Sequence, residues 1–254
     1  MAEAPPSYAI LGRGRWAGVI RDVLAGMGRR CAFLEDTRRK SGESDVAYKV
    51  RLGAKMTESR AEIAWICTLP GPHILLITEA ALAAGLHAIA EKPWPYSLSE
   101  ARPCLNLARA NRRQVGVHFE YCLLDGVESW RKEFAGGAGL RFGGHFRVPG
   151  GDRLGMSAID NLGCHLFAVR EYAVPEAKVA EIVCDYEAAN ERKVWLEREG
   201  REAASVSFRE NKEPIIQRYI VQFESALEGT PFPFDLEFAA RVADSLSRWK
   251  RSRA

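Results

Sequence analysis

Two stretches of the sequence carry residue types that could perform acid–base chemistry. In Glu91-Lys92-Pro93 the proline restricts the backbone of the lysine before it. An ammonium at the carboxyl edge of a sheet lies where ligands bind in open α/β folds. Asn161 and His165 are four residues apart in a helical stretch, so they share one helix face. An imidazole titrates near neutral pH and can take or give a proton. Taken alone, a surface lysine and a structural histidine are the commoner interpretations.

A glycine motif precedes both stretches. Gly12-Arg13-Gly14-Arg15-Trp16-Ala17 fits GxGxxA, between a strand-like run and a helical one. In that context Gly12 permits a tight turn, Gly14 lets a pyrophosphate approach the backbone, and Ala17 keeps the helix close to the strand. The helix N-terminus offers free N–H groups to the phosphates. The alternative is a glycine-rich turn that binds no ligand.

Four charged residues follow the second strand-like run, namely Glu35, Asp36, Arg38 and Arg39. An acid at this place accepts hydrogen bonds from the ribose hydroxyls of NAD, whereas an arginine binds the 2′-phosphate of NADP. A solvated charged loop is the third interpretation. The choice between NAD and NADP therefore stays open.

The elements that must position these residues alternate in the first half of the chain. Strand-like runs occupy residues 8–11, 30–34, 63–69, 88–90 and 114–118. Helical stretches occupy residues 16–27, 44–52, 73–84 and 99–111, the last with Ser99 as its expected N-cap. Such alternation predicts an α/β Rossmann domain whose parallel sheet is covered by helices on both faces.

The second half has a different pattern. Strand-like runs at residues 140–148, 178–186, 192–197 and 203–209 lie among helical stretches at 123–134, 160–172, 215–227 and 236–249. Glu199-Gly200-Arg201 is a hairpin signal. We therefore predict a smaller α+β domain with a mostly antiparallel sheet. The expected division is a dinucleotide-binding domain at residues 1–120 and a substrate and oligomerisation domain at residues 121–254.

Composition excludes several classes of function. The 254 residues are 47% apolar and carry a net charge of +3, which is too small to indicate nucleic-acid binding. No window approaches the roughly 20 apolar residues of a membrane helix, and the first residues lack a secretory signal core. The six cysteines form no CxxC pair, so we expect free thiols and a cytoplasmic location. We find no metal-ligand cluster.

Together the motifs resemble the Gfo/Idh/MocA family of oxidoreductases, named for glucose-fructose oxidoreductase and inositol dehydrogenase. The match rests on four motifs in the right order: Gly12-x-Gly14-x-x-Ala17, Thr68-Leu69-Pro70-x-x-His73, Ala90-Glu91-Lys92-Pro93 and Asn161-x-Gly163-x-His165. Residues 8–172 resemble the family well and the remainder only loosely.

The resemblance implies a Rossmann domain, an open second sheet and bound NAD or NADP. It places Thr68, Pro70, His73 and Glu91 around the nicotinamide, and Lys92, beside a cis peptide bond, facing the reacting carbinol. His165 would transfer the proton, and Asn161 would fix a hydroxyl of the substrate. The residues expected to contact the cofactor are Gly12, Gly14, Arg15, Trp16, Ala17, Glu35, Asp36, Arg38, Arg39, Thr68, Pro70, His73, Glu91, Lys92 and Pro93.

The implied substrate is a sugar, a nucleotide sugar or a polyol-like alcohol or ketone, and the implied assembly is a homo-oligomer formed through the second sheet. The chain departs from the family in its short second half. It also carries His118-Phe119-Glu120-Tyr121 where many members have an arginine, and Ala168 where many have an aspartate. Two alternatives follow: a non-catalytic dinucleotide-binding regulator or scaffold, and an enzyme of different chemistry, such as an imine reductase or a redox-cycling lyase or hydrolase.

Overall fold

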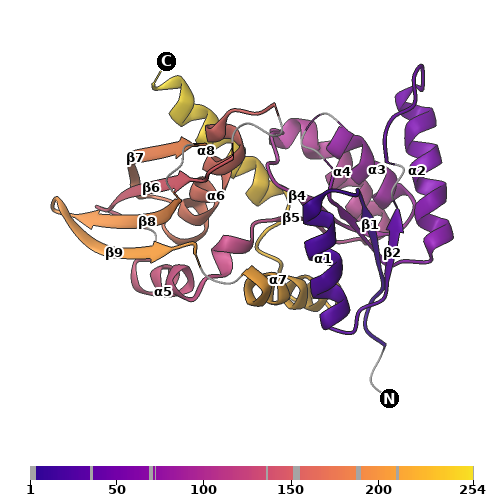
Figure 1. The fold of residues 1–254 in the computed structure, drawn as a ribbon, viewed down its shortest axis with the longest axis horizontal. Helices are drawn as coiled ribbons and strands as arrows, with labels where there is room; N and C mark the ends of the chain where they lie inside the picture. The colour runs from indigo at the N-terminus through magenta and orange to yellow at the C-terminus, as the bar shows by residue number, and fades with distance from the viewer. Residues whose placement is uncertain are drawn as a thin grey trace. The chain divides into compact units, whose positions relative to one another are not determined.

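The computed structural model describes residues 4–34, 37–68, 71, 73–135, 137–150, 155–186, 190–209 and 212–253. The chain forms two compact units (Figure 1). The first unit comprises Met1–His118 and Ile216–Ala240, and the second comprises Phe119–Ile215 and Arg241–Ala254. The division at residue 120 into two functional domains stays a prediction. Residues 216–240, which that prediction assigned to the second domain, cluster with the first unit.

The first unit is built on a five-stranded parallel sheet of order β2-β1-β3-β4-β5. Its strands are β1 (Tyr8–Leu11), β2 (Cys31–Leu34), β3 (Ile63–Ile66), β4 (His87–Glu91) and β5 (Val115–His118). Strands β1, β3 and β5 are buried at every residue, as expected for apolar runs covered on both faces. The predicted Rossmann-type α/β fold is confirmed.

Helices cover both faces of this sheet. Helices α2 (Asp45–Ser59), α3 (His73–Ala83) and α4 (Leu98–Asn111) pack in sequence against one another. On the other face, α7 (Lys212–Leu227) brings Tyr219 to within 6.1 Å of Trp65 on β3, measured between ring centroids. Helix α1 (Arg15–Gly26) lies on that face too, since Trp16 is 6.1 Å from His118.

The expected cap of α4 at Ser99 was wrong. Ser97 is the N-cap: its hydroxyl accepts from the backbone of Glu100, and the Glu100 carboxylate accepts from the backbone N–H of Ser97. This capping box requires the acid three residues after the cap, which fits Ser97 and not Ser99.

The segment that follows α7 covers the edge strand β5. The backbone N–H of Val117 donates to the carbonyl oxygen of Phe234 over 2.8 Å. A β-carbon at Gly116 would lie 2.4 Å from a ring carbon of Phe232, so only glycine permits this packing. An otherwise open sheet edge is thereby closed from within the chain.

The second unit contains a four-stranded sheet of order β7-β6-β8-β9. Its elements are η1 (Glu120–Leu123), α5 (Asp125–Glu133), β6 (Arg141–Arg147), α6 (Ala158–Ala173), β7 (Lys178–Asp185), β8 (Glu191–Arg198), β9 (Arg201–Ser207) and most of α8 (Leu236–Arg251). Two strand pairs are antiparallel, while β6 and β7 are parallel because α6 connects them. The prediction of a mostly antiparallel sheet is confirmed. Glu199 and Gly200 form the hairpin turn with φ of 52° and 76°, as a type I′ turn requires.

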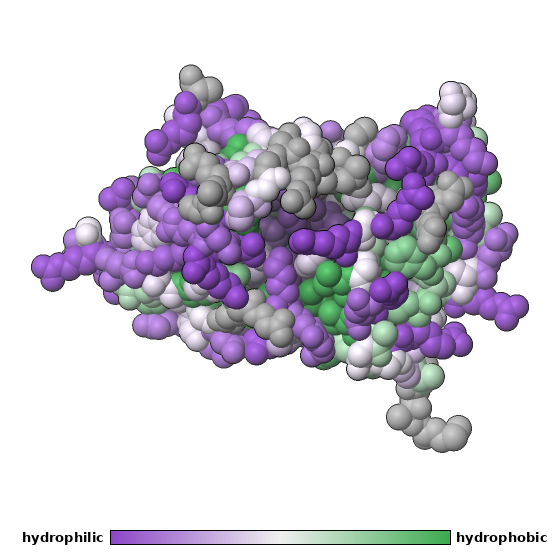
Figure 2. Space-filling model, viewed as in Figure 1, coloured by the Kyte–Doolittle hydropathy of each residue, from purple (hydrophilic) through white to green (hydrophobic). Residues whose placement is uncertain are grey.

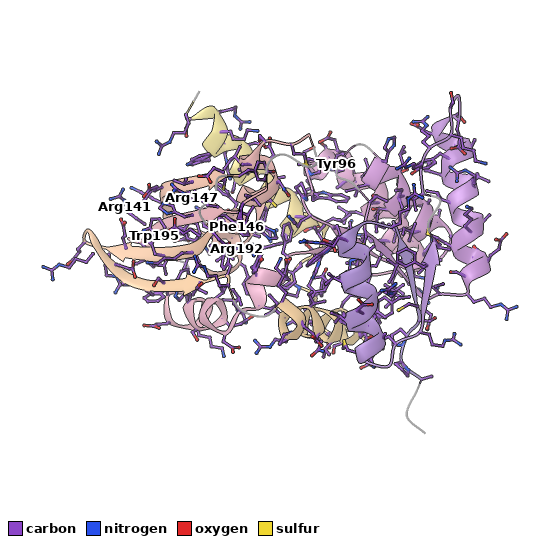
Figure 3. The ribbon with its side chains drawn as sticks, viewed as in Figure 1. Tyr96, Arg141, Phe146, Arg147, Arg192 and Trp195 are labelled. Atoms are coloured by element: carbon purple, nitrogen blue, oxygen red, sulfur yellow. The ribbon has the colours of Figure 1, made fainter. Side chains whose placement is uncertain are left out.

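The two faces of the second sheet differ in chemistry. Phe142 and Phe146 are buried on the face that carries α6, where Leu166 packs against Gly144. The opposite face carries Arg141, Arg147 and Trp195 (Figure 3). Side chains over the β8–β9 hairpin are mostly hydrophilic (Figure 2). Among the described residues, no helix has the length and apolar content needed to cross a bilayer.

Candidate active site

The turn between β1 and α1 contains two glycines whose surroundings differ. Gly12 has φ +125°, and a β-carbon there would lie 2.5 Å from the carbonyl oxygen of Cys67. At Gly14 a β-carbon would meet no atom within 4 Å. Gly14 is the N-cap of α1 and, having no side chain, makes no capping hydrogen bond. A helix N-terminus of this kind can bind an anion.

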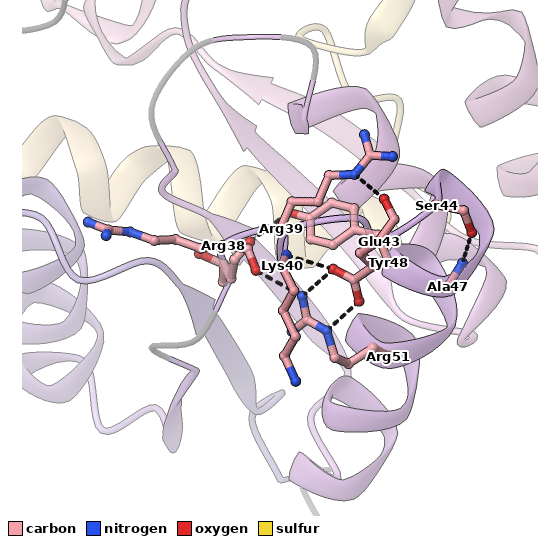
Figure 4. A network of polar contacts seen from close by, with 9 residues as sticks. Arg38, Arg39, Lys40, Glu43, Ser44, Ala47, Tyr48 and Arg51 are labelled. Atoms are coloured by element: carbon pink, nitrogen blue, oxygen red, sulfur yellow. Dashed lines mark hydrogen bonds and ion pairs between the residues drawn. The ribbon is translucent and has the colours of Figure 1, made fainter.

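The loop between β2 and α2 holds a network of charged side chains (Figure 4). Arg51 binds the Glu43 carboxylate over 2.7 and 2.9 Å, and this, with the Lys40 backbone N–H, lowers the pKa of Glu43 to about 2. Arg39 donates to the Glu43 carbonyl oxygen and forms a 2.7 Å ion pair with Asp45. The Arg38 side chain points away from this network, and within the described chain its guanidinium has no hydrogen bond or ion pair. Glu35 and Asp36 lie outside the described residues.

Residues after β3 supply the next part of the predicted site. The hydroxyl oxygen of Thr68 is buried and has no hydrogen-bond partner in the described structure. His73 is exposed at the first residue of α3, with its ring edge-on to Tyr48 at 6.0 Å. Pro70 lies outside the described residues.

Lys92 directly follows β4 and is half-buried. Its peptide bond to Pro93 is cis. The next residue, Trp94, is 3% exposed, yet its indole N–H has no hydrogen-bond partner among the described residues. Sequence reasoning did not single out Trp94. A polar aromatic residue directly after the Glu-Lys-Pro motif was the available signal, because a buried indole N–H normally finds an acceptor.

Glu91 lies in a buried polar cluster, and its place beside the nicotinamide stays a prediction. Its carboxylate is buried and accepts hydrogen bonds from Nε1 of Trp65 at 2.9 Å and Nδ1 of His118 at 3.0 Å. Burial alone would raise the pKa of Glu91, but the charge of His118 and hydrogen bonds from His118 and Trp65 lower it overall.

Asn161 and His165 lie on α6, in the second unit. The Asn161 amide donates to the Tyr186 hydroxyl at 3.0 Å, a partner at the end of β7 that sequence spacing could not reveal. His165 is 3% exposed, stacks on Phe146 at 5.3 Å and meets Tyr121 edge-on at 4.7 Å.

Gly163, between Asn161 and His165, packs against side chains of its own unit. A β-carbon there would lie 2.8 Å from Ile159 and 3.5 Å from Leu246 on α8. The glycine therefore permits side-chain packing inside the second unit.

The structure thus gathers the glycine turn, Thr68, Glu91, Lys92 and Pro93 at the carboxyl ends of β1, β3 and β4. This edge of an open parallel sheet is where such folds bind ligands. Lys92 belongs to the first unit and His165 to the second, and their joint action stays a prediction. Within the described residues, no group of three His, Cys, Asp or Glu side chains could hold a metal ion.

Solved structures identify the fold. The UDP-N-acetylglucosamine 3-dehydrogenase GnnA from Acidithiobacillus ferrooxidans superposes with a TM-score of 0.75 at 13% identity, covering 97% of each chain. An inositol dehydrogenase homolog from Azotobacter vinelandii, complexed with NADH and myo-inositol, gives 0.71 at 17% identity, covering 96% of this chain and 94% of that chain.

The chain has the fold of Gfo/Idh/MocA-type oxidoreductases. A third structure with this fold is the WlbA (WbpB) dehydrogenase from Thermus thermophilus in complex with NAD and UDP-GlcNAcA, with a TM-score of 0.70, 16% identity, and coverage of 96% of this chain and 94% of that chain. No family model and no curated protein matches the sequence. At these identities the resemblance to the solved structures is one of fold.

Proposed function

We propose that the protein is an NAD(P)-dependent dehydrogenase or reductase that acts on a CH–OH group of a sugar, a nucleotide sugar or a polyol-like alcohol or ketone. The observation that carries the proposal is the Gly12–Gly14 turn, which leaves open space at the N-terminus of α1, at the ligand-binding edge of the sheet. Two structures of the same fold support it: the inositol dehydrogenase homolog is complexed with NADH and myo-inositol, and WlbA with NAD and UDP-GlcNAcA.

The residues present fit a dinucleotide. Gly12, Gly14, Arg15, Trp16 and Ala17 would hold the pyrophosphate at the start of α1. The unpartnered Thr68 hydroxyl would bind a polar group of the nicotinamide half, since a buried hydroxyl without a partner is costly. The bound cofactor supplies the acceptor or donor of the hydride. Its form depends on Glu35, Asp36, Arg38 and Arg39, and His73, Pro70 and Pro93 complete the proposed contacts.

Three side chains would act on the substrate. The Lys92 ammonium would stabilise negative charge that develops on the substrate oxygen. His165 would take the hydroxyl proton during oxidation and return it during reduction. Asn161 cannot transfer a proton, but its amide, held by Tyr186, would orient a hydroxyl group.

We also propose an assembly and a location. Copies of the chain would associate through the face of the second sheet that carries Trp195, because α6 packs on the opposite face. The free thiols of all six cysteines fit the reducing cytoplasm.

The test has two stages. Titration calorimetry with NAD⁺ and NADP⁺ should show binding of at least one dinucleotide. A panel of sugars, nucleotide sugars and polyols, followed by absorbance of the reduced nicotinamide, should then show turnover. Absence of dinucleotide binding would refute the proposal. Binding without turnover of any alcohol or ketone would favour the regulator or scaffold instead.

A further inference from the structure

The Glu91 carboxylate is the centre of a buried cluster in the first unit. It accepts from Trp65 on β3 at 2.9 Å and from His118 on β5 at 3.0 Å, and the ring of Trp16 at the start of α1 lies 6.1 Å from that of His118. Glu91 is 5% exposed and His118 is fully buried. Two donors from two different strands therefore converge on one carboxylate, and α1 contacts one of them.

His118 is the titratable donor of this cluster. Glu91 and His118 are neighbours in the register of β4 and β5, and their side chains form an ion pair when the imidazole is protonated. A buried carboxylate is unfavourable unless it is paired and hydrogen-bonded. Aromatic rings enclose the imidazole edge-on, with Trp65 at 5.1 Å and Tyr219 at 4.6 Å. His118 therefore has little freedom to leave Glu91.

The cluster adjoins two parts of the proposed site along the chain. Lys92 is the next residue after Glu91, and buried Pro93 and Trp94 follow it. The backbone on both sides of Lys92 is thus anchored. Trp16 directly follows the Gly12–Gly14 turn and the first residue of α1. Through the contact of Trp16 with His118, the same cluster therefore adjoins both the turn that would bind phosphates and the lysine that would face the substrate.

We propose that His118 is a positioning residue: by holding the Glu91 carboxylate, it keeps the backbone of Lys92 and the start of α1 in fixed positions relative to one another. The proposal rests on the proposed function, which it deepens. In this proposal Glu91 holds Lys92 and the glycine turn in position, instead of making the predicted contact with the nicotinamide.

The test compares His118→Leu, which removes the donor, with His118→Asn, which keeps an N–H at the place of Nδ1 without a titratable charge. His87→Asn is the matched control: His87 is at the start of β4, at the opposite end of that strand from Glu91, and accepts from the Gln114 backbone N–H at 2.8 Å. Circular dichroism first checks that each variant folds. If His118→Leu fails to fold, Glu91→Gln, which keeps the shape and removes the charge, replaces it.

The first readout needs neither cofactor nor substrate. Hydrogen exchange followed by mass spectrometry should show the peptide spanning residues 88–96 exchanging at least about tenfold faster in His118→Leu. It should be nearly unchanged in His118→Asn and His87→Asn. Exchange in His118→Leu equal to wild type would overturn the proposal, whatever the wild-type protein does with a dinucleotide.

The second readout separates positioning from mere stability. In folded His118→Leu we expect at least a fivefold weaker dinucleotide Kd and at least a tenfold lower kcat, with the substrate KM within twofold. His118→Asn should recover most of both losses. A lower melting temperature with unchanged Kd and kcat would show a purely structural role and overturn the proposal. If the wild-type protein itself binds no dinucleotide, the proposed function is refuted instead.

Discussion

The hydroxyl of Tyr8, on the first strand, donates a 2.8 Å hydrogen bond to the carboxylate of Glu224, on α7. Arg29 binds the same carboxylate through two nitrogens at 2.9 and 2.7 Å. Two residues more than 200 positions apart are thus joined at the base of the first unit. This contact anchors α7 to the amino-terminal end of β1, at the edge of the sheet opposite the proposed site.

Replacing Glu224 should therefore destabilise the first unit. Glu224→Ala leaves the Tyr8 hydroxyl and the Arg29 guanidinium without their acceptor, and we expect a loss of roughly 2 kcal/mol. For a chain of this size that corresponds to about 4–8 °C in melting temperature. Glu228→Ala, at an exposed position just beyond α7, is the control and should change little. Equal melting temperatures for both variants would show that the contact contributes nothing.

The two glycines of the turn should respond differently to substitution. In Gly14→Ala the added methyl meets no protein atom, so stability should stay within about 0.5 kcal/mol. Dinucleotide affinity should nonetheless fall about tenfold, because the methyl occupies the space proposed for the pyrophosphate.

Gly12→Ala should instead lower stability by roughly 2–3 kcal/mol, because of its positive φ and the nearby Cys67 carbonyl. Calorimetry and thermal melts separate the two effects. Unchanged affinity in Gly14→Ala would place the dinucleotide elsewhere.

Cofactor choice should depend on Arg38 more than on Arg39. Arg39 is already bound to Asp45 and to the Glu43 carbonyl oxygen, whereas Arg38 points away from that network. We expect Arg38→Ala to weaken NADP⁺ relative to NAD⁺ by about tenfold, since an arginine can bind the 2′-phosphate through two hydrogen bonds. Arg39→Ala should change that ratio less than threefold. A thermal-shift series with both dinucleotides measures this, and the reverse order would contradict the assignment.

Much of this architecture could be predicted from short stretches of the sequence. Buried strands appear as continuous apolar runs, and the Glu199-Gly200 turn has its own signature. The parallel pairing of β6 and β7 was not apparent, because periodicity gives a strand's faces and not its direction. The return of residues 216–240 to the first unit was also hidden, since the contacts of Tyr219 and Phe234 are made with strands more than 100 residues earlier.

The candidate site divides in the same way. Gly12, Gly14 and Lys92 belong to short motifs with a local mechanism. The pairing of Glu91 with His118 and of Asn161 with Tyr186 depends on which strands and helices become neighbours, so only the fold reveals it. Trp94 carried a weak local signal that was overlooked.

His87 should give the protein a pH-dependent stability. Burial, and then the charge of Arg113, lower the pKa of His87 to about 4. In the unfolded chain His87 has the ordinary pKa of about 6.5, so the full free energy of unfolding is retained above that pH. As the pH falls from about 6.5 to 4, the unfolded chain binds the proton before the folded protein does, and the contribution of His87 to stability is lost.

The His87 contribution amounts to about 1 kcal/mol after allowance for solvent screening. His87→Asn keeps an acceptor for the Gln114 N–H and removes the titration. Its melting temperature should fall less than that of the wild type between pH 7 and pH 5. Parallel pH profiles would refute this explanation.

The central claim is that this chain transfers hydride with Lys92 and His165 in the roles proposed above. Its most direct test is kcat/KM, in both directions, for Lys92→Met and His165→Asn on a substrate found by the panel. We predict a loss of at least about 100-fold in each variant, with dinucleotide Kd within threefold of wild type. Turnover in either variant that equals the wild type would contradict the account.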